Sequence, residues 1–419
     1  MTIDSVFRRV LKVATRPLER FLQIEAASGI VLVVISALAM GWANSPWSHS
    51  YHALWEVQVG FGIFPPVTVH WVINDILMVI FFFLVGLEIK REIHHGELSE
   101  WRRAALPALG ALGGMVAPAL LYLLVAGEPE THAGWGVPTA TDIAFAVGIL
   151  TLLGKRVPPA LRVLLLALAV IDDLGAILVI AFFYSSGVNG SSLLVAGVGM
   201  LLVAALQFLK IERKLVYLLP GVIIWTGIYG AGVHPTIAGV VIGLMTPIQS
   251  RGIAANGDAA ESPVEALIHR LHPWVAYGIM PVFALANAGV TLQGLRLEGS
   301  GQWVALGVVV GLVAGKPLGI VFACMLALKL RVASLPRGLS FNHLLVLGVV
   351  AGIGFTMALF VAQLAFQDVQ LLEAAKLGVL CASALAAVLG LALGRWLLSP
   401  VQPRGAAATA DEAERSTEL

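Results

Sequence analysis

Four ionisable residues lie inside long apolar stretches of this sequence. Asp142, Asp172, Asp173 and Lys316 each fall near the middle of a hydrophobic run. A charged side chain at the centre of a bilayer costs at least about 2.5–3.5 kcal/mol on insertion scales, so its presence there needs a reason. Three acids against one base also leave negative charge for a cationic species to neutralise. These residue types therefore predict a site for protons or small cations.

The adjacent acids indicate how such a site would work. Neighbouring residues on a helix point about 100° apart, so we expect one of Asp172 and Asp173 to face Lys316 and the other to face a cavity with Asp142. Carboxylates in one low-dielectric cavity repel one another, and they can hold a proton or a small cation but hold both poorly. Lys316 would add a second proton site. This competition favours antiport. A buried salt-bridge cluster that only locks helices together is the alternative.

The elements that position these residues are predicted to be membrane helices. Hydrophobic residues make up 58% of the 419-residue chain and charged residues only 12%, with a mean hydropathy of +0.90. The apolar stretches are about 17–25 residues long, as a helix that crosses a bilayer requires, and they lack the alternation of a β-barrel. We predict an all-α polytopic membrane protein with about twelve transmembrane helices. The predicted spans are 24–43, 68–88, 103–125, 135–153, 159–184, 192–210, 213–230, 232–248, 267–290, 302–329, 339–364 and 371–398.

The basic residues predict the orientation of these spans. Of the 26 Lys and Arg residues, 23 fall on alternate loops and on the two terminal segments. The side richer in Lys and Arg faces the cytoplasm, so both termini are predicted to be cytoplasmic. The net charge of +1 is spread around the loops, which argues against nucleic acid as a partner and leaves membrane lipid.

The chain divides into three parts by composition. Residues 1–23 are predicted to be a basic cytoplasmic segment, in which 5–22 is either a helix on the inner membrane surface or a solvated basic arm. Residues 24–398 would form a single transmembrane domain, and 399–419 a disordered cytoplasmic tail. Within the outer loop 44–66, the alternation at 57–64 allows a short extended segment that could pair with another copy, although a plain ordered loop is the default.

Two spans carry residues that interrupt helices. The fourth contains VPTATD (137–142) and the eleventh GVVAGIGFTMALF (348–360). Paired interrupted spans point to a transporter site, because half-helix ends offer carbonyls and dipoles in mid-membrane. We predict discontinuous helices in spans 4 and 11 and an inverted repeat of spans 3–5 and 10–12. In span 11 the alternative is that the glycines only allow close helix packing and do not break the helix.

Glycines in span ten and the cysteines have simpler interpretations. Gly307, Gly311, Gly315 and Gly319 form a four-residue ladder that would let a neighbouring backbone approach Lys316. Cys324 and Cys381 lie in apolar runs and are predicted to act as small hydrophobic packing residues. The Cys and His residues show no metal-ligand spacing, and no cofactor is expected.

Three other classes of protein could use charges in mid-membrane. An intramembrane aspartyl protease needs two acids, but this chain lacks the YD and GxGD pair that such enzymes resemble. Broken helices around charges would also suit an ion channel. A channel, however, needs a continuous path for its ion and no proton that competes with the ion for the site. Symport of an organic acid is disfavoured because the excess charge of the site is negative.

At these same residues the sequence resembles the NhaA-type sodium/proton antiporters, over essentially residues 20–398. TATDIAFA and IDDLGAI at this spacing are very specific to that family. The stretches that carry the resemblance are FFFLVGLEIKRE (81–92), PTATDIAFAVG (138–148), ALAVIDDLGAI (167–177), GVHPTIAGV (232–240), LHPWVAY (271–277), FALANAGV (283–290) and AGKPLG (314–319).

The resemblance implies a function and roles for the charged residues. It implies a non-enzymatic, electrogenic Na⁺(Li⁺)/H⁺ antiporter of the bacterial cytoplasmic (inner) membrane, a homodimer that serves pH and sodium homeostasis. Asp173 would be the main cation and proton site, and sodium would bind at Asp172 and Asp173. Asp172 would also pair with Lys316. Asp142 with Thr141 would support the crossing of two broken helices.

The resemblance also implies activation at alkaline pH by a cytoplasmic cluster. The matching positions are Glu88, Arg91 and Glu92, which could equally be charges that reach the inner membrane surface. Many relatives place an acid beside the position of His269, where this chain has Ile268. His234 is a possible modulator. Asp75 could line an exit path or be a paired structural acid.

Overall fold

The computed structural model describes residues 27–60, 66–185, 187, 189–211, 214–248, 262–293 and 298–400. This part of the chain is almost entirely helical. The sheet within it is a hairpin of two short antiparallel strands, β1 (Gln58–Val59) and β2 (Val67–Thr68). The predicted all-α class is confirmed. The N-terminal segment 1–23 and positions 401–419 of the predicted tail lie outside the described residues.

Among the described residues, 6 helices are long and apolar enough to cross a membrane without a break. Two of them contain a π-helical turn, where one extra residue widens the helix. The six are Val69–His95 (α3 Val69–Trp71, the π-helix η1 Val72–Leu77 and α4 Met78–His95), α5 (Trp101–Val125), α7 (Pro159–Phe183), α8 (Gly190–Phe208), Ser300–Lys329 (α13 Ser300–Val310, the π-helix η7 Gly311–Gly315 and α14 Lys316–Lys329) and α17 (Val369–Leu397).

Bent helix pairs raise the number of possible spans in the described residues to 9. These pairs are Ala27–Ala43 with α2 (Ser48–Glu56), η3 (His132–Thr139) with α6 (Ile143–Leu152), and α15 (Phe341–Ala351) with α16 (Phe355–Ala365). The remaining helices are α9 (Leu218–Gly230), α10 (Thr236–Met245), the run of α11 (Pro263–Trp274), the π-helix η6 (Val275–Ile279) and α12 (Met280–Asn287), and the short turns η2 (Glu97–Ser99), η4 (Gly154–Arg156) and η5 (Lys214–Tyr217). A multi-pass membrane protein is confirmed, whereas the number twelve and the inverted repeat stay predictions.

Both predicted interruptions are present as bends. η3 and α6 meet at 42°, and α15 and α16 meet at 47°. The first bend follows Pro138. Asp142 has an extended backbone there, and its side chain caps the new helix α6 by accepting from the Phe145 N–H. The second bend contains Gly352 and Gly354. Residues that cap or break helices therefore stand where the chain changes direction.

The outer loop expected at residues 44–66 is partly wrong. The structure has the helix α2 there, bent by 110° from Ala27–Ala43. Tyr51 and Trp55 lie one turn apart on one face of α2, and both are buried. The extended segment exists as β1, and it pairs with β2 of the same chain. Residues 61–64 of the expected segment lie outside the described part.

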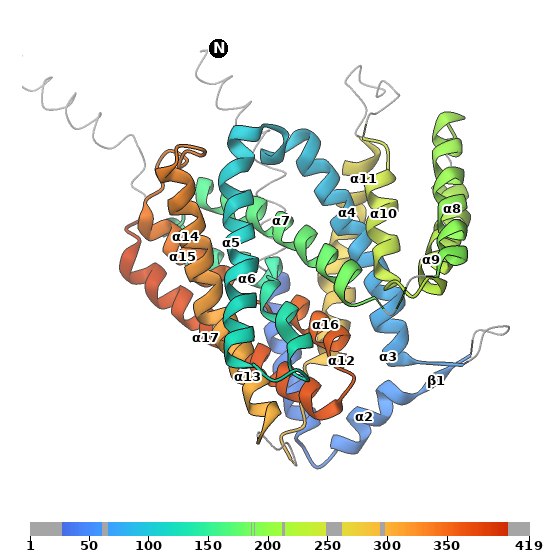
Figure 1. Ribbon diagram of the computed structural model, residues 1–419, viewed down its shortest axis with the longest axis horizontal. Coiled ribbons are helices and arrows are strands. Elements are labelled where there is room, and N and C mark those ends of the chain that lie inside the picture. The colour runs from blue at the N-terminus through green and yellow to red at the C-terminus, as the bar shows by residue number, and fades with distance from the viewer. Residues whose placement is uncertain are drawn as a thin grey trace, which may run out of the picture.

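The helices form two groups with further helices between them (Figure 1). α8, α9 and α10 lie on one side next to α4, and α13, α14, α15 and α17 lie on the other side next to α5. α6, α7 and α16 lie in the middle. α2 and the hairpin lie at the end where α3 begins, and the connection from α4 to α5 lies at the opposite end.

The glycine ladder brings α14 and η7 against α5. A methyl group added at Gly319 would lie 2.1 Å from the Gly113 carbonyl oxygen, and one at Gly315 would lie 2.7 Å from the Pro118 Cα. These distances are shorter than any ordinary carbon contact, so the two backbones touch. The predicted approach of a neighbouring backbone near Lys316 is confirmed, and small residues make it possible.

Replacing Gly319 with alanine tests this contact. The new methyl group would overlap the Gly113 carbonyl and force the two helices apart, so Gly319→Ala should lower the free energy of unfolding by roughly 1–3 kcal/mol. The measurement is thermal unfolding of the purified protein in detergent. Gly197→Ala on α8 is the matched control, because nothing lies within 4 Å of a methyl group there. Equal melting temperatures for the two variants would contradict the interpretation.

Candidate functional site

Two non-helical segments cross between the halves of the broken helices. They are residues 140–142, between η3 and α6, and residues 352–354, between α15 and α16. The Asp142 N–H donates to the Ile353 carbonyl at 2.7 Å, and the Thr141 hydroxyl donates to the Ala351 carbonyl at 2.9 Å. Lipid offers no hydrogen bonds, so non-helical backbone in a membrane persists only where protein groups satisfy it. The two segments, which we call the crossing, therefore satisfy each other.

The Asp142 carboxylate joins two helix N-termini at the crossing. Its Oδ1 accepts from the Phe145 N–H of α6 at 3.0 Å, and its Oδ2 accepts from the Thr356 N–H of α16 at 3.1 Å. The Thr356 hydroxyl also donates to Oδ2. A helix N-terminus carries partial positive charge, which stabilises an anion. The charge of Asp142 is therefore largely compensated by the two helices that it caps.

Lys316 compensates negative charge on the other side of the crossing. Its Nζ donates to Asp172 Oδ2 at 2.7 Å and to the Thr139 carbonyl, at the C-terminal end of η3, at 2.5 Å. Both side chains of the ion pair are fully buried. The π-helical turn η7 ends directly before Lys316. The lysine therefore ties α14 to α7 and to a broken helix.

Asp173 has no such compensation among the described residues. Its side chain is only 3% exposed, and its Oδ1 has no hydrogen-bond partner in this part of the chain. It points into a cavity, whereas the neighbouring Asp172 does not line that cavity. The separation of the two acids follows from their adjacent positions on α7, which turn their side chains to different sides.

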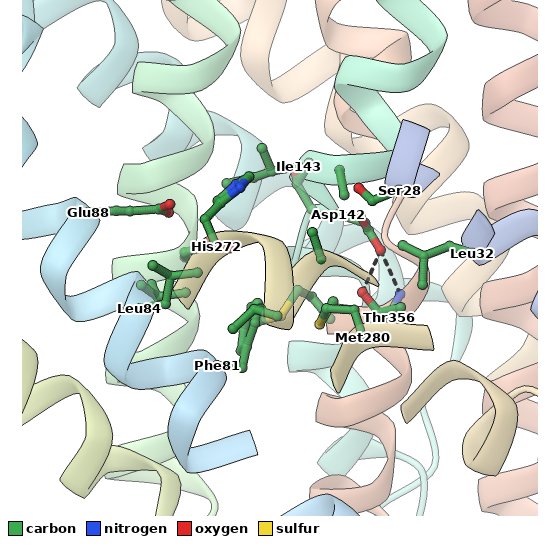
Figure 2. Close-up of a pocket in the computed structure, with 17 residues that line it drawn as sticks. Ser28, Leu32, Phe81, Leu84, Glu88, Asp142, Ile143, His272, Met280 and Thr356 are labelled. Atoms are coloured by element: carbon green, nitrogen blue, oxygen red, sulfur yellow. Dashed lines mark hydrogen bonds between the residues drawn. The ribbon is translucent and has the colours of Figure 1, made fainter. Parts of the chain in front are cut away.

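The cavity beside Asp173 is small and has an excess of negative charge. It offers about 60 Å³ to the centres of water molecules, which is room for a few waters at about 10–15 Å³ each. Its charged lining consists of Asp142, Asp173 and Glu88, with His272 as a further titratable group. In the view of Figure 2, Asp142 and Thr356 lie at one end and Glu88 with His272 at the other. Such a cavity can hold a proton or a small dehydrated cation.

The four residues predicted to sense pH do not form one group. Glu88 lines the cavity, whereas Glu92, one turn further along α4, accepts from the Glu97 N–H at 2.7 Å and holds the turn into η2. Arg91 is half-buried on α4. His234 lies elsewhere, before α10, with Nε2 3.8 Å from Asp75 Oδ1. Glu88 is thus the member of the set that lies nearest to the predicted cation site.

Three polar lining residues were not predicted as part of the site. Thr356 follows the glycines of the second bend, and its bond to Asp142 depends on how the two broken helices meet. His272 is buried although it is titratable, and it stands before a proline within the quoted stretch LHPWVAY. Ser28 lines the cavity from the helix Ala27–Ala43. A histidine at the start of an apolar run is the sequence signal that could have revealed His272.

The described residues contain no cluster of side chains that could hold a resident metal ion. No group of three or more His, Cys, Asp and Glu residues there could hold a metal ion. Cys324 is buried, which agrees with its predicted packing role. Cys381 is exposed on α17, so the packing role predicted for it is wrong.

Comparison with solved structures defines the class of the fold. The structure of the sodium proton antiporter MjNhaP1 from Methanocaldococcus jannaschii, at pH 8, matches with a TM-score of 0.54 and 14% sequence identity. The match covers 92% of this chain and 98% of that chain. The described helices therefore share the fold of that structure.

Sequence comparison identifies the family. The profile of the family described as Na⁺/H⁺ antiporter 1 matches residues 19–393, and the chain belongs to this family. A relative named Na(+)/H(+) antiporter NhaA 2 from Myxococcus xanthus is 56% identical, over 98% of this chain and 96% of the relative. A protein named Na(+)/H(+) antiporter NhaA from an Acidovorax species is 51% identical, over 91% of this chain and 92% of that protein. The family is one of transporters.

Removing Lys316 tests its part in the stability of the site. Lys316→Met would leave Asp172 as an uncompensated buried charge, which typically costs about 3–5 kcal/mol of stability. The double variant Lys316→Met/Asp172→Leu removes both charges and should recover a large part of that loss. Melting temperatures of the native protein, both single variants and the double variant measure the coupling. Additive losses in this cycle would show that the pair is not energetically coupled.

Proposed function

We propose that this protein is an electrogenic Na⁺(Li⁺)/H⁺ antiporter that expels sodium in exchange for protons. The observation that carries the proposal is the contrast between the three buried acids. Asp142 is stabilised by two helix N-termini and Asp172 by Lys316, whereas Asp173 Oδ1 has no hydrogen-bond partner among the described residues. A buried charge without a partner needs a proton or a cation. Family membership and the names of the relatives support sodium as that cation.

Asp173 is proposed to be the exchanged site, with help from its neighbours. A cation that enters the cavity displaces a proton from Asp173 and takes its carboxylate oxygens. Asp172 does not line the cavity in this structure, so it joins the cation by turning toward it with Oδ1, which also lacks a hydrogen-bond partner in the described part of the chain. Thr141 and Asp142 line the same cavity and hold the crossing in place. Hard oxygen ligands of this kind suit Na⁺ and Li⁺. The proton and the cation therefore exclude one another.

The size of the cavity supports a small cargo. About 60 Å³ for water centres is enough for an ion with a few waters. An organic acid would need more space, and its carboxylate would meet Glu88, Asp142 and Asp173 in the lining. Like charges in such a site repel strongly. Cation exchange is therefore favoured over symport of an organic acid.

Lys316 supplies the second proton that makes the exchange electrogenic. When a cation engages Asp172, the ammonium of Lys316 loses its carboxylate partner and can release a proton. One proton from Asp173 and one from Lys316 would then leave for each monovalent cation that binds, so about one net charge crosses the membrane in each cycle. The fully buried ion pair supports this coupling.

Alkaline activation follows from the same competition. As the pH rises, fewer protons compete with the cation at the site, so exchange increases. Glu88 is proposed as the first residue of the pH response because it lines the cavity, with Arg91, Glu92 and His234 in secondary positions. We further propose the bacterial inner membrane, both termini in the cytoplasm, a homodimer and a role in intracellular pH and sodium homeostasis.

Asp173→Asn tests the exchanged site. The amide can neither release a proton nor neutralise a cation, so exchange should fall to background. The measurement is proton release on addition of Na⁺, Li⁺ or K⁺ to inverted vesicles that hold a pH gradient, between about pH 6.5 and 9. Asp368→Asn is the matched control, because asparagine also caps a helix and Asp368 only caps α17. Normal exchange in Asp173→Asn would remove Asp173 from the mechanism.

Charge movement tests the proposed stoichiometry. In proteoliposomes whose potassium gradient sets the membrane potential, a potential that is negative on the side receiving protons should accelerate the exchange, because the proton flux carries more charge than the cation flux. The readout is the initial rate of sodium efflux at several potentials. An exchange rate independent of potential would mean that one proton moves for each cation.

A further inference from the structure

A second cavity lies beyond the crossing, toward the end of the helices where α2 and the hairpin lie (Figure 1). It is larger, with about 290 Å³ available to the centres of water molecules, and its lining includes Tyr51, Glu56, Thr68, His70, Glu373 and Lys376. These residues come from α2, β2, α3 and the start of α17. We call it the outer cavity, and the cavity at Asp173 the inner cavity.

The charges of the outer cavity favour a cation. Lys376 Nζ lies 3.0 Å from Glu373 Oε1, so the lysine is occupied by that acid. The second oxygen, Glu373 Oε2, is buried without a hydrogen-bond partner among the described residues, and Glu56 adds another carboxylate to the lining. The lining therefore has two acids for one lysine, together with His52 and His70. Negative potential in a low-dielectric recess concentrates cations.

Three side-chain amides close the space between the two cavities. Asn74 Nδ2 donates to Gln363 Oε1 at 2.7 Å, Gln363 Nε2 donates to Asn287 Oδ1, and Asn287 Nδ2 donates to Asn74 Oδ1 at 3.0 Å. Each amide donates to one member and accepts from the other, so the three form a closed ring. His70 Nε2, from the lining of the outer cavity, adds a contact of 3.0 Å to Asn287 Oδ1. We call this group the amide ring.

The order of residues along the helices places the amide ring between the cavities. In Val69–His95, His70 lines the outer cavity, Asn74 belongs to the ring and Phe81 lines the inner cavity. In the α12 helix the order is reversed, with Met280 at the inner cavity and Asn287 in the ring. The same holds for α16, where Thr356 lines the inner cavity and Gln363 belongs to the ring.

A layer of phenylalanines separates the amide ring from the inner cavity. The rings of Phe82 and Phe283 lie 5.4 Å and 6.1 Å from that of Phe360, and all three side chains are buried. They lie on the same three helices as the amide ring. Water and ions cannot pass such a packed apolar layer while it is closed. The amide ring joins α16, which belongs to a broken helix, to η1 and α12, so it holds this layer together.

We propose that the outer cavity is a binding site for a hydrated monovalent cation at the far mouth of the transport path, and that the amide ring is the latch that separates it from the inner cavity. This proposal rests on the exchange proposed above. In the closed ring every amide oxygen accepts a hydrogen bond, so none is available to an ion. When α16 moves away from η1 and α12, the ring opens and its carbonyl oxygens become ligands between the two cavities. Amide oxygens are ligands that hard cations accept.

Two cysteine variants on one helix test the position of the mouth. Met280 lines the inner cavity and Ala286 the outer one, both on α12 and about 9 Å apart along the axis. In a background with Cys324→Ala and Cys381→Ala, a charged, membrane-impermeant thiol reagent should modify Met280→Cys from one face of the membrane and Ala286→Cys from the opposite face. Right-side-out and inverted vesicles supply the two faces. Modification of both cysteines from the same face, or no modification of Ala286→Cys, would overturn the outer cavity as a mouth.

Opening the latch should change the labelling rate. Gln363→Ala removes one member of the amide ring and two of its hydrogen bonds, so the open state becomes more populated. Labelling of Met280→Cys from the face that modifies Ala286→Cys should then accelerate about fivefold or more. Gln207→Ala is the matched control. It removes an amide that donates to the Met245 carbonyl, far along the chain from both cavities. An unchanged rate in a Gln363→Ala variant with a normal melting temperature would overturn the latch.

The labelling results separate this proposal from the proposed function. Labelling from opposite faces needs no transported ion, so it can succeed in a protein that exchanges nothing. If the native protein exchanges no cation for protons, the proposed antiport is wrong, but the outer cavity can still be a mouth. Conversely, normal Na⁺/H⁺ exchange with both cysteines labelled from one face would overturn the mouth and leave the antiport intact.

Discussion

Non-helical backbone in the middle of a membrane protein must find its hydrogen bonds inside the protein. The structure meets this constraint at the crossing, where two broken helices bond to each other and an acidic and a basic side chain bond to their ends. Asp142 stands at two N-termini and Lys316 at the C-terminal end of η3. Each charge is thus of the sign opposite to that of the helix end it touches. The remaining features of the site follow from this arrangement, since it leaves Asp173 as the acid without compensation in the described chain.

Widened helices recur around this arrangement. The π-helical turn η1 contains Asn74, and η6 lines the inner cavity. The third π-helical turn, η7, comes directly before Lys316. A π-turn weakens the regular hydrogen-bond ladder and shifts the side chains that follow it. The helices that surround the crossing are therefore locally irregular where they carry polar side chains. Unbroken helices such as α5 and α17 provide the frame around them.

The sequence was sufficient to predict what depends on local composition. Asp142, Asp172, Asp173 and Lys316 are recognisable because charge is rare in apolar runs, and the two breaks are recognisable from proline and glycine. Features that depend on how distant segments meet were not predictable. Asn74 and Asn287 are 213 positions apart, and an amide in an apolar run does not reveal its partner. The helix α2 was not predicted because only two of its residues, Tyr51 and Trp55, are buried, and so short an apolar pattern also fits an ordered loop.

The touching backbones of α5 and α14 limit how the protein can move. Gly113 and Gly319 approach so closely that each carbonyl occupies the space where the other residue would carry a side chain. Sliding one helix along the other would drive these carbonyls into the larger side chains next to the glycines, so shear between the two helices is blocked. Hinge rotation, in which packed elements turn together, remains available. α5 and α14 therefore carry Lys316 as part of one rigid body, and any alternation of access must take place at the surface of that body.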